Sequence, residues 1–129
     1  NPIVDTVYVK SSDLKYLNLK YRASFDALSS YTNITNQKPI FALSKSYFNE
    51  ALSCYNIKVY DEIYDSEMVK IELFRYIPYT TKNLDTIDPF TLYITIKNCL
   101  DTEDLKVENA ISELYGILEE IVFNIKGKT

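Results

Sequence analysis

Hydrophobic and polar residues alternate in the first part of the chain, which is the pattern of β-strands with one buried face. The clearest run places Leu17, Leu19, Tyr21, Ala23 and Phe25 between polar residues. A shorter run at 7–9 precedes it, so we expect two neighbouring strands of a meander. Residues 26–41 show no clear period, and their polar part, 32–38, predicts a loop.

Two further alternating runs, 57–63 and 69–77, predict a β-hairpin, since only a short polar connection around Asp65-Ser66 separates them. The residues expected on the core face are Ile57, Val59, Ile63, Val69, Ile71 and Leu73. Pro78 ends the second strand because proline has no backbone N–H to donate.

Apolar residues three and four positions apart predict a helix from Ser44 to Tyr55. Ser44 or Ser46 can accept a hydrogen bond from the first free N–H groups and so cap its start. Asn56 suits the left-handed position that often ends a helix.

The last part of the chain carries the longest helical pattern. Its apolar seam consists of Val107, Ile111, Leu114, Leu118, Ile121 and Ile125. Asp101 or Thr102 can cap the start, and Gly127 closes the helix. We expect the seam to cover a sheet. Pairing with a partner helix is the alternative, although about two and a half heptads are few for a coiled coil.

Residues 88–97 carry two conflicting patterns. Asp88-Pro89 is a good helix start, with a capping carboxylate and a proline at the first helical position. The following residues nevertheless alternate strictly and are rich in β-branched and aromatic types, which favours a strand. We favour the strand and keep the helix as the alternative.

Together these elements predict an α+β fold. A largely antiparallel sheet of about five strands is packed by two main helices, the last of them amphipathic and C-terminal. With 129 residues we expect one globular domain over 1–129. The chain starts without Met, so we expect it to be excised from a longer protein. No apolar run is long enough to cross a membrane, and we expect no signal peptide, because the first residues have neither a basic nor an apolar stretch.

The composition argues against the commonest catalytic and metal chemistry. The chain has no His, only two Gly and only two Cys. It therefore lacks the usual general base and metal ligand, and it has no glycine-rich phosphate loop. We interpret Cys54 and Cys99 as two buried thiols of an intracellular protein, cytoplasmic or nuclear. We expect no catalytic residues, no metal site and no cofactor.

Codon usage lowers the weight of the tyrosine count, and the charge distribution points to a partner surface. The chain has 14 Lys and Arg, only two of them Arg, and it is rich in Ile, Asn and Tyr. An AT-rich genome produces this bias, so the 12 tyrosines carry less weight than their number suggests. Residues 1–45 have a net charge of +3 and residues 46–129 one of −7. Such asymmetry is typical of a surface that meets a partner.

The predicted hairpin carries the first candidate site. If its aliphatic residues face the core, its aromatic residues share the opposite face, and Tyr79 extends it. These residues are Tyr60, Tyr64, Phe74, Tyr76 and Tyr79. Tyrosine buries a large area and keeps a polar group, so we predict a protein interface there. The alternative is that a helix of the same chain covers this face.

The second candidate is a basic strip on the outward side of the run 16–24, made of Tyr16, Asn18, Lys20 and Arg22. Aromatic and basic side chains on a strand can stack bases and contact phosphates. Arginine is rare and the chain is acidic, so a solvated strand face is the simpler interpretation.

The acidic residues Asp61, Glu62, Asp65 and Glu67 lack the spacing of a calcium loop, and we interpret them as the solvated end of the hairpin.

The sequence therefore predicts a non-catalytic protein–protein interaction or regulatory domain that binds a protein partner or a second copy through an aromatic sheet face. A nucleic-acid-associated regulator that uses the strip around Lys20 and Arg22 is the alternative. Nucleic acid is not the favoured partner, and no membrane association is expected.

Overall fold

A computed structural model describes residues 1–35, 37–76, 85–97 and 104–127. Over these residues the fold is α+β, with a four-stranded mixed sheet and five helices. The elements in chain order are β1 (Ile3–Lys10), the 3-10 helix η1 (Ser11–Tyr16), β2 (Tyr21–Arg22), α1 (Ser24–Leu28), β3 (Ile40–Ser44), α2 (Lys45–Cys54), β4 (Met68–Phe74), α3 (Pro89–Ile96) and α4 (Leu105–Gly127). The predicted fold class and the C-terminal helix are confirmed.

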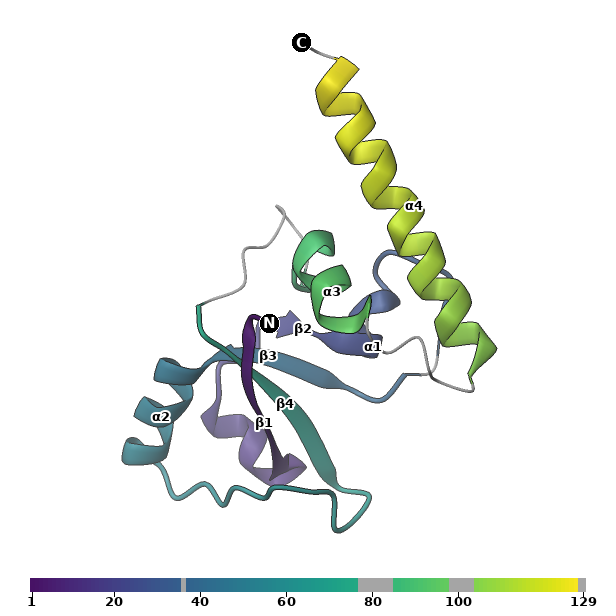
Figure 1. Ribbon diagram of the computed structural model, residues 1–129. Helices are drawn as coiled ribbons and strands as arrows, with labels where there is room; N and C mark the ends of the chain where they lie inside the picture. Colours follow the sequence, from purple (N-terminus) through teal and green to yellow (C-terminus); the bar gives the residue numbers. More distant parts are fainter. Residues whose placement is uncertain (36, 77–84, 98–103, 128–129) are drawn as a thin grey trace.

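The strands lie in the order β1-β4-β3-β2 (Figure 1). Strand β4 pairs with β1 in antiparallel and with β3 in parallel orientation, so Ile71 has Val7 on one side and Phe41 on the other. The expectation of about five largely antiparallel strands is thus matched only roughly. The predicted meander pair is wrong, because β1 and β2 lie at opposite edges of the sheet.

The predicted hairpin does not form. Residues 57–63 contain no strand, and their only ladder contact is an isolated bridge between Tyr60 and Tyr8. The physical reason is competition for β4, whose two edges are already occupied by β1 and β3. The run 57–63 is therefore left to pass along the outer edge of β1.

The long alternating run before residue 26 also differs from its prediction. Only Tyr21 and Arg22 of this run form a strand: η1 ends at Tyr16, residues 17–20 contain no strand, and α1 begins at Ser24. Ser24 has a left-handed φ of 53°, which turns the chain abruptly out of β2. The segment 26–41, which has no clear period, contains the end of α1 and the start of β3.

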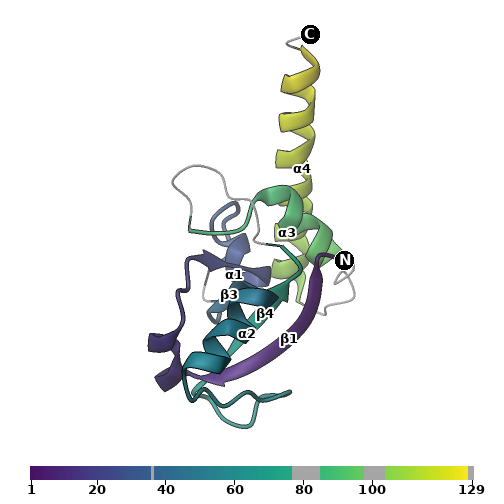
Figure 2. The same cartoon turned by 90° about the vertical axis from the view of Figure 1, so that its left-hand side faces the viewer.

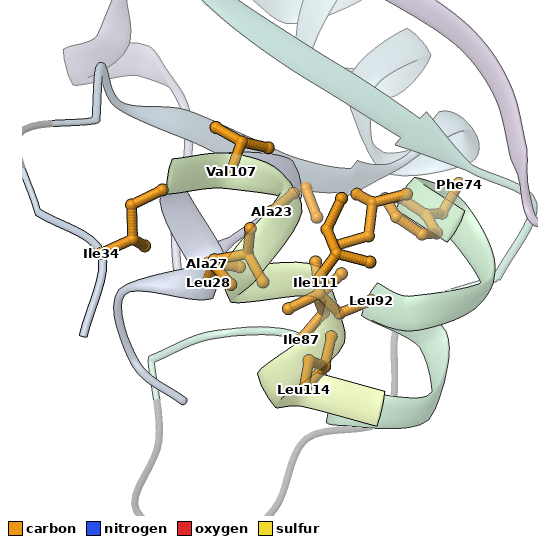
Figure 3. Close-up of a cluster of buried hydrophobic side chains, with 13 residues drawn as sticks. Ala23, Ala27, Leu28, Ile34, Phe74, Ile87, Leu92, Val107, Ile111 and Leu114 are labelled. Atoms are coloured by element: carbon orange, nitrogen blue, oxygen red, sulfur yellow. The ribbon is translucent and has the colours of Figure 1, made fainter. Parts of the chain in front are cut away.

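Helices cover both faces of the sheet, as two views of the molecule show (Figures 1 and 2). On one face Ala42 and Phe74 pack against α1, α3 and α4. Figure 3 shows this cluster, in which side chains from all three helices meet. On the other face Ile71 and Leu73 pack against η1 and α2, including Phe48. Over the described residues, the sheet therefore lies between two hydrophobic clusters, and neither of its faces is an open aromatic surface.

Capping side chains explain two helix starts. The Ser44 hydroxyl accepts a hydrogen bond from the Tyr47 N–H at 3.2 Å, which confirms the predicted start of α2. Residues 88–97 form α3 and not the favoured strand. Asp88 decides this conflict, because its carboxylate accepts hydrogen bonds from both the N–H and the hydroxyl of Thr91, at 2.9 and 2.6 Å. Pro89 at the first helical position supports the same start.

Other predicted helix ends are corrected or lie outside the described residues. At the end of α2, Tyr55 is extended, and Ser24 is the only described residue other than glycine with a positive φ, so Asn56 is no left-handed cap. The proposed caps of α4, Asp101 and Thr102, are outside the described residues. Asp104 accepts a hydrogen bond from the Lys106 N–H at 3.0 Å.

Candidate interaction surfaces

The five aromatic residues predicted as one interface do not share a face. Phe74 lies in the core with 1% of its surface exposed, whereas Tyr76, just beyond the end of β4, is 77% exposed. Tyr60 and Tyr64 lie in the segment beside β1, and Tyr79 is outside the described residues. The common face depended on the hairpin, and without it β4 buries Phe74 under the helices.

Tyr60 and Tyr64 form a small aromatic cluster at the edge of the sheet. Their ring centroids are 5.6 Å apart in an edge-to-face arrangement. The ammonium of Lys58 lies 5.4 Å from the Tyr60 ring centroid, and the Tyr64 hydroxyl donates a hydrogen bond to Asp61 at 3.3 Å. The negative charge of Asp61, aided by Glu62, raises the pKa of the Tyr64 phenol. Two of the predicted interface residues therefore stay together, in an acidic setting.

The acidic residues between Asp61 and Glu67 occupy an exposed connection and not a hairpin end. The Asp65 carboxylate accepts a hydrogen bond from the Glu67 N–H at 2.9 Å, which shapes the turn into β4. Over the described residues, no three His, Cys, Asp or Glu side chains gather closely enough to hold a metal ion. Their contribution here is a negative surface beside the sheet.

The basic strip is only partly available to a ligand. Tyr16 stacks on Tyr55 at 5.0 Å between ring centroids, and the backbone N–H of Asn18 donates to the Tyr47 hydroxyl at 2.8 Å. Lys20 is exposed, and it lines a shallow cavity of about 200 Å³ between β3 and the start of α2. Tyr16 is thus engaged at one end of the strip, whereas exposed Asn18 lines the same cavity as Lys20, which is the most accessible cation of the strip.

Arg22 is held by its own chain. Its guanidinium donates to the Ser29 hydroxyl at 3.1 Å and to the Asp85 carboxylate at 3.2 Å, and it also contacts Ser30. Asp26 lies 3.9 Å away. Burial raises the pKa of Asp26, although the Ile40 N–H and Arg22 counteract this effect. Arg22 therefore joins β2, α1 and the segment before α3, and its guanidinium is not presented to phosphates.

Replacing Arg22 by alanine is expected to lower the free energy of unfolding by about 1 kcal/mol, because it removes hydrogen bonds from a partly buried charged group. Lys20→Ala is the matched control two residues away and is expected to change stability by less than about 0.5 kcal/mol. Urea unfolding of both variants measures the difference. Equal effects would show that Arg22 has no structural role.

Several exposed apolar residues lie on α3 and α4; the sequence analysis considered a partner contact for the α4 seam but not for α3. On α3, Phe90 and Ile94 are exposed one turn apart. The Tyr93 ring packs 5.5 Å from that of Tyr115 on α4, and Tyr115 itself is half exposed. The signal in the sequence was the length of the α4 seam, which exceeds what a small sheet can cover.

The second half of α4 projects from the rest of the molecule, and both views show its free end away from the sheet (Figures 1 and 2). The seam is buried at Val107, Ile111, Leu114 and Leu118. Further along, Ile121 is half buried and Ile125 is 61% exposed, with Val122 exposed beside them. The predicted role of this seam, to cover a sheet, therefore holds only for its first half.

The remaining candidates carry little chemistry. Cys54 is an exposed free thiol at the end of α2, so the prediction of a buried thiol is wrong there, and Cys99 is outside the described residues.

No helix among the described residues is long and apolar enough to cross a membrane. No family model, curated protein or solved structure matches this chain.

Proposed function

We propose that this chain is a non-catalytic protein–protein interaction domain that associates with a second copy of itself through the second half of α4. The observation that supports this proposal is the seam of α4, which continues with the same spacing after the sheet no longer covers it. The aromatic sheet face predicted from the sequence is replaced by this helical surface.

The exposed half of the seam is energetically unusual. A helix of 23 residues is about 35 Å long. Val122 and Ile125 expose apolar surface to water. They lie on the same side of the helix that is buried in the N-terminal part of α4. Covering one such side chain completely contributes about 1.5–3 kcal/mol. An isolated helical extension gains little from propensity alone, so a packing partner would stabilise it.

The neighbouring helix also carries exposed apolar residues. Phe90 and Ile94 of α3 are exposed, and α3 and α4 are joined through the contact between Tyr93 and Tyr115. Apolar residues on both helices are what a four-helix interface requires, with two helices from each copy. The short seam of α4 then need not act as a coiled coil by itself.

A second copy is the simplest partner for such a surface. Residues spaced by three and four positions pack into the gaps between residues with the same spacing. A two-fold axis brings the same patch of each copy together, and an antiparallel arrangement lets each projecting helix end pack against its counterpart. One self-complementary surface is therefore sufficient for the dimer.

The test is the molar mass of the chain in solution over a range of concentrations, measured by light scattering and sedimentation. We expect a dimer that Ile125→Glu together with Val122→Glu dissociates, with an affinity loss of at least about 100-fold from burying charge in an apolar contact. Phe123→Glu is the matched control. Phe123 is 75% exposed but projects from the opposite side of the helix, so this variant is expected to remain dimeric.

Two results contradict the proposal. A chain that stays monomeric at all concentrations excludes self-association through α4. A dimer that Phe123→Glu dissociates while the double variant at Val122 and Ile125 stays intact would show that a different side of the helix forms the contact. Circular dichroism of each variant verifies that α4 is still helical.

A further inference from the structure

The outer edge of β1 is only partly covered. Tyr8 exchanges both of its backbone hydrogen bonds with Tyr60, each at 2.9 Å, so the N–H and C=O of Tyr8 point away from β4. Backbone groups alternate in direction along an antiparallel strand, and those of Thr6 therefore point to the same outer side. The Thr6 N–H is indeed bonded to the Asp5 side chain, at 2.8 Å, and not to β4.

Next to this edge lies a groove. The bridge between Tyr8 and Tyr60 is antiparallel, so the chain continues from Tyr60 alongside Val7 before it leaves the edge. A groove of about 360 Å³ opens there, lined by Asp5, Thr6, Val7, Val59, Tyr60, Asp61 and Tyr64. One wall is thus an unpaired strand edge, and the other carries two aromatic rings.

The groove is negatively charged. The ionisable side chains that line it are two carboxylates, Asp5 and Asp61, and two tyrosines, with Glu62 next in the chain. The nearest cation on this segment, Lys58, lies against the Tyr60 ring. The same negative charge, that of Asp61 first, raises the pKa of the Tyr64 phenol. A ligand that fits here carries positive charge.

We propose that the outer edge of β1 at Thr6 binds an extended basic segment of a partner protein, which adds to the sheet as a further strand. Edge strands recognise extended peptides through backbone hydrogen bonds, and side chains at alternate positions add specificity. The Thr6 carbonyl accepts a hydrogen bond from the added strand, and the Thr6 N–H exchanges its bond to the Asp5 carboxylate for one to that strand. Lysine or arginine side chains of that strand approach Asp5 and Asp61, and its apolar residues contact Tyr60 and Tyr64.

Three capped fluorescent peptides of about eight residues test this proposal. The first alternates lysine and valine, the second has glutamate in place of lysine, and the third is the first with proline at two central valines. Fluorescence anisotropy measures the affinity of each for the whole chain. We expect the first to bind at least about tenfold more tightly than either of the others, because the second reverses the charge and the third cannot form the strand.

Variants of the edge separate backbone pairing from charge. Thr6→Pro removes an outward N–H but no hydrogen bond to β4, so it is expected to fold and to weaken the basic peptide at least about tenfold. Thr6→Val keeps the N–H and is the matched control with unchanged binding. Asp5→Asn with Asp61→Asn is expected to weaken the basic peptide by about fivefold to tenfold and to reduce its salt dependence.

Several results would overturn this inference. Equal binding of the basic peptide and its proline version would indicate charge attraction without strand addition. No binding of the basic peptide, or equal binding of the acidic one, would also exclude it. If circular dichroism shows that Thr6→Pro does not fold, the proline peptide still tests strand addition and the Asp5/Asp61 variant still tests the role of charge. None of these readouts depends on α4, so this inference and the proposed dimer can fail separately.

Discussion

Replacing Phe74 by alanine is expected to lower the free energy of unfolding by about 3–5 kcal/mol, the usual cost of removing a buried phenylalanine. Phe74 closes β4 under the helices, where it packs in one cluster with Ile87 and Leu92 (Figure 3). The loss combines the transfer free energy of the ring with that of the cavity it leaves, because close-packed neighbours relax only partly.

Tyr76→Ala is the matched control for this prediction. Tyr76 lies two residues beyond Phe74 and is exposed, so its loss is expected to change stability by less than about 0.5 kcal/mol. Urea unfolding followed by circular dichroism measures both variants. The sequence pattern assigns the two residues to one interface, and similar effects of the two substitutions would support that assignment against the structure.

Replacing Glu72 by leucine is expected to stabilise the protein at pH 7 by about 1–3 kcal/mol, because it removes a buried carboxylate that is only partly satisfied. Glu72 lies in the middle of β4 between Thr6 and Ala42, and its Oε1 atom is buried without a hydrogen-bond partner among the described residues. Burial raises its pKa above the usual value near 4.5, although the positive charge of Lys70 lowers it somewhat.

The pH dependence of this effect has a defined sign. Between the unfolded and the raised folded pKa of Glu72, the folded state keeps a proton that the unfolded state has lost. The contribution of Glu72 to stability therefore falls as the pH rises through this window. The advantage of Glu72→Leu should be largest at neutral pH and shrink as the pH falls toward 4.5. Because other carboxylates have pH effects of their own, the difference between variant and parent is the quantity to measure.

Glu67→Leu serves as the control for Glu72→Leu. Glu67 is exposed just before β4, so this substitution is expected to change stability by less than about 0.5 kcal/mol at any pH. Denaturant unfolding at several pH values from 4 to 8 compares the three proteins. A difference between Glu72→Leu and the parent that stays constant over this range would show that Glu72 has the same pKa in both states.

The two proposed surfaces lie apart in the molecule. The free end of α4 points away from the segment that borders β1 (Figure 1). A dimer formed through α4 would therefore leave the β1 edges of both copies accessible. Two copies of a weak peptide site in one particle raise the apparent affinity for a partner with two basic segments. This arrangement links the two proposals without making either depend on the other.

The sequence pattern was most successful where the signal is local. The spacing of apolar residues predicted α2 and α4, and one of the two candidate caps, Ser44, does cap α2, because capping involves residues three positions apart. The same local chemistry was available at Asp88-Pro89, where the alternation of Phe90, Leu92 and Ile94 was given more weight. The segment forms a helix because the Asp88 cap satisfies free N–H groups directly, whereas an alternating pattern stabilises a strand only if a partner strand is available.

What the sequence could not determine is which strands pair and what the elements cover. Nothing local distinguishes a hairpin partner for β4 from β1 and β3, which are distant in the chain and occupy both of its edges. That pairing buried Phe74, left Tyr60 and Tyr64 beside an open edge and exposed the end of the α4 seam.

The sequence by itself thus determined the α+β class, the C-terminal amphipathic helix and the start of α2, since these depend on contacts within a few residues. Only the tertiary structure decided the order of the strands and which aromatic residues reach the surface. Burial depends on the neighbours that long-range pairing brings together, and alternation records only that one side of a segment is apolar.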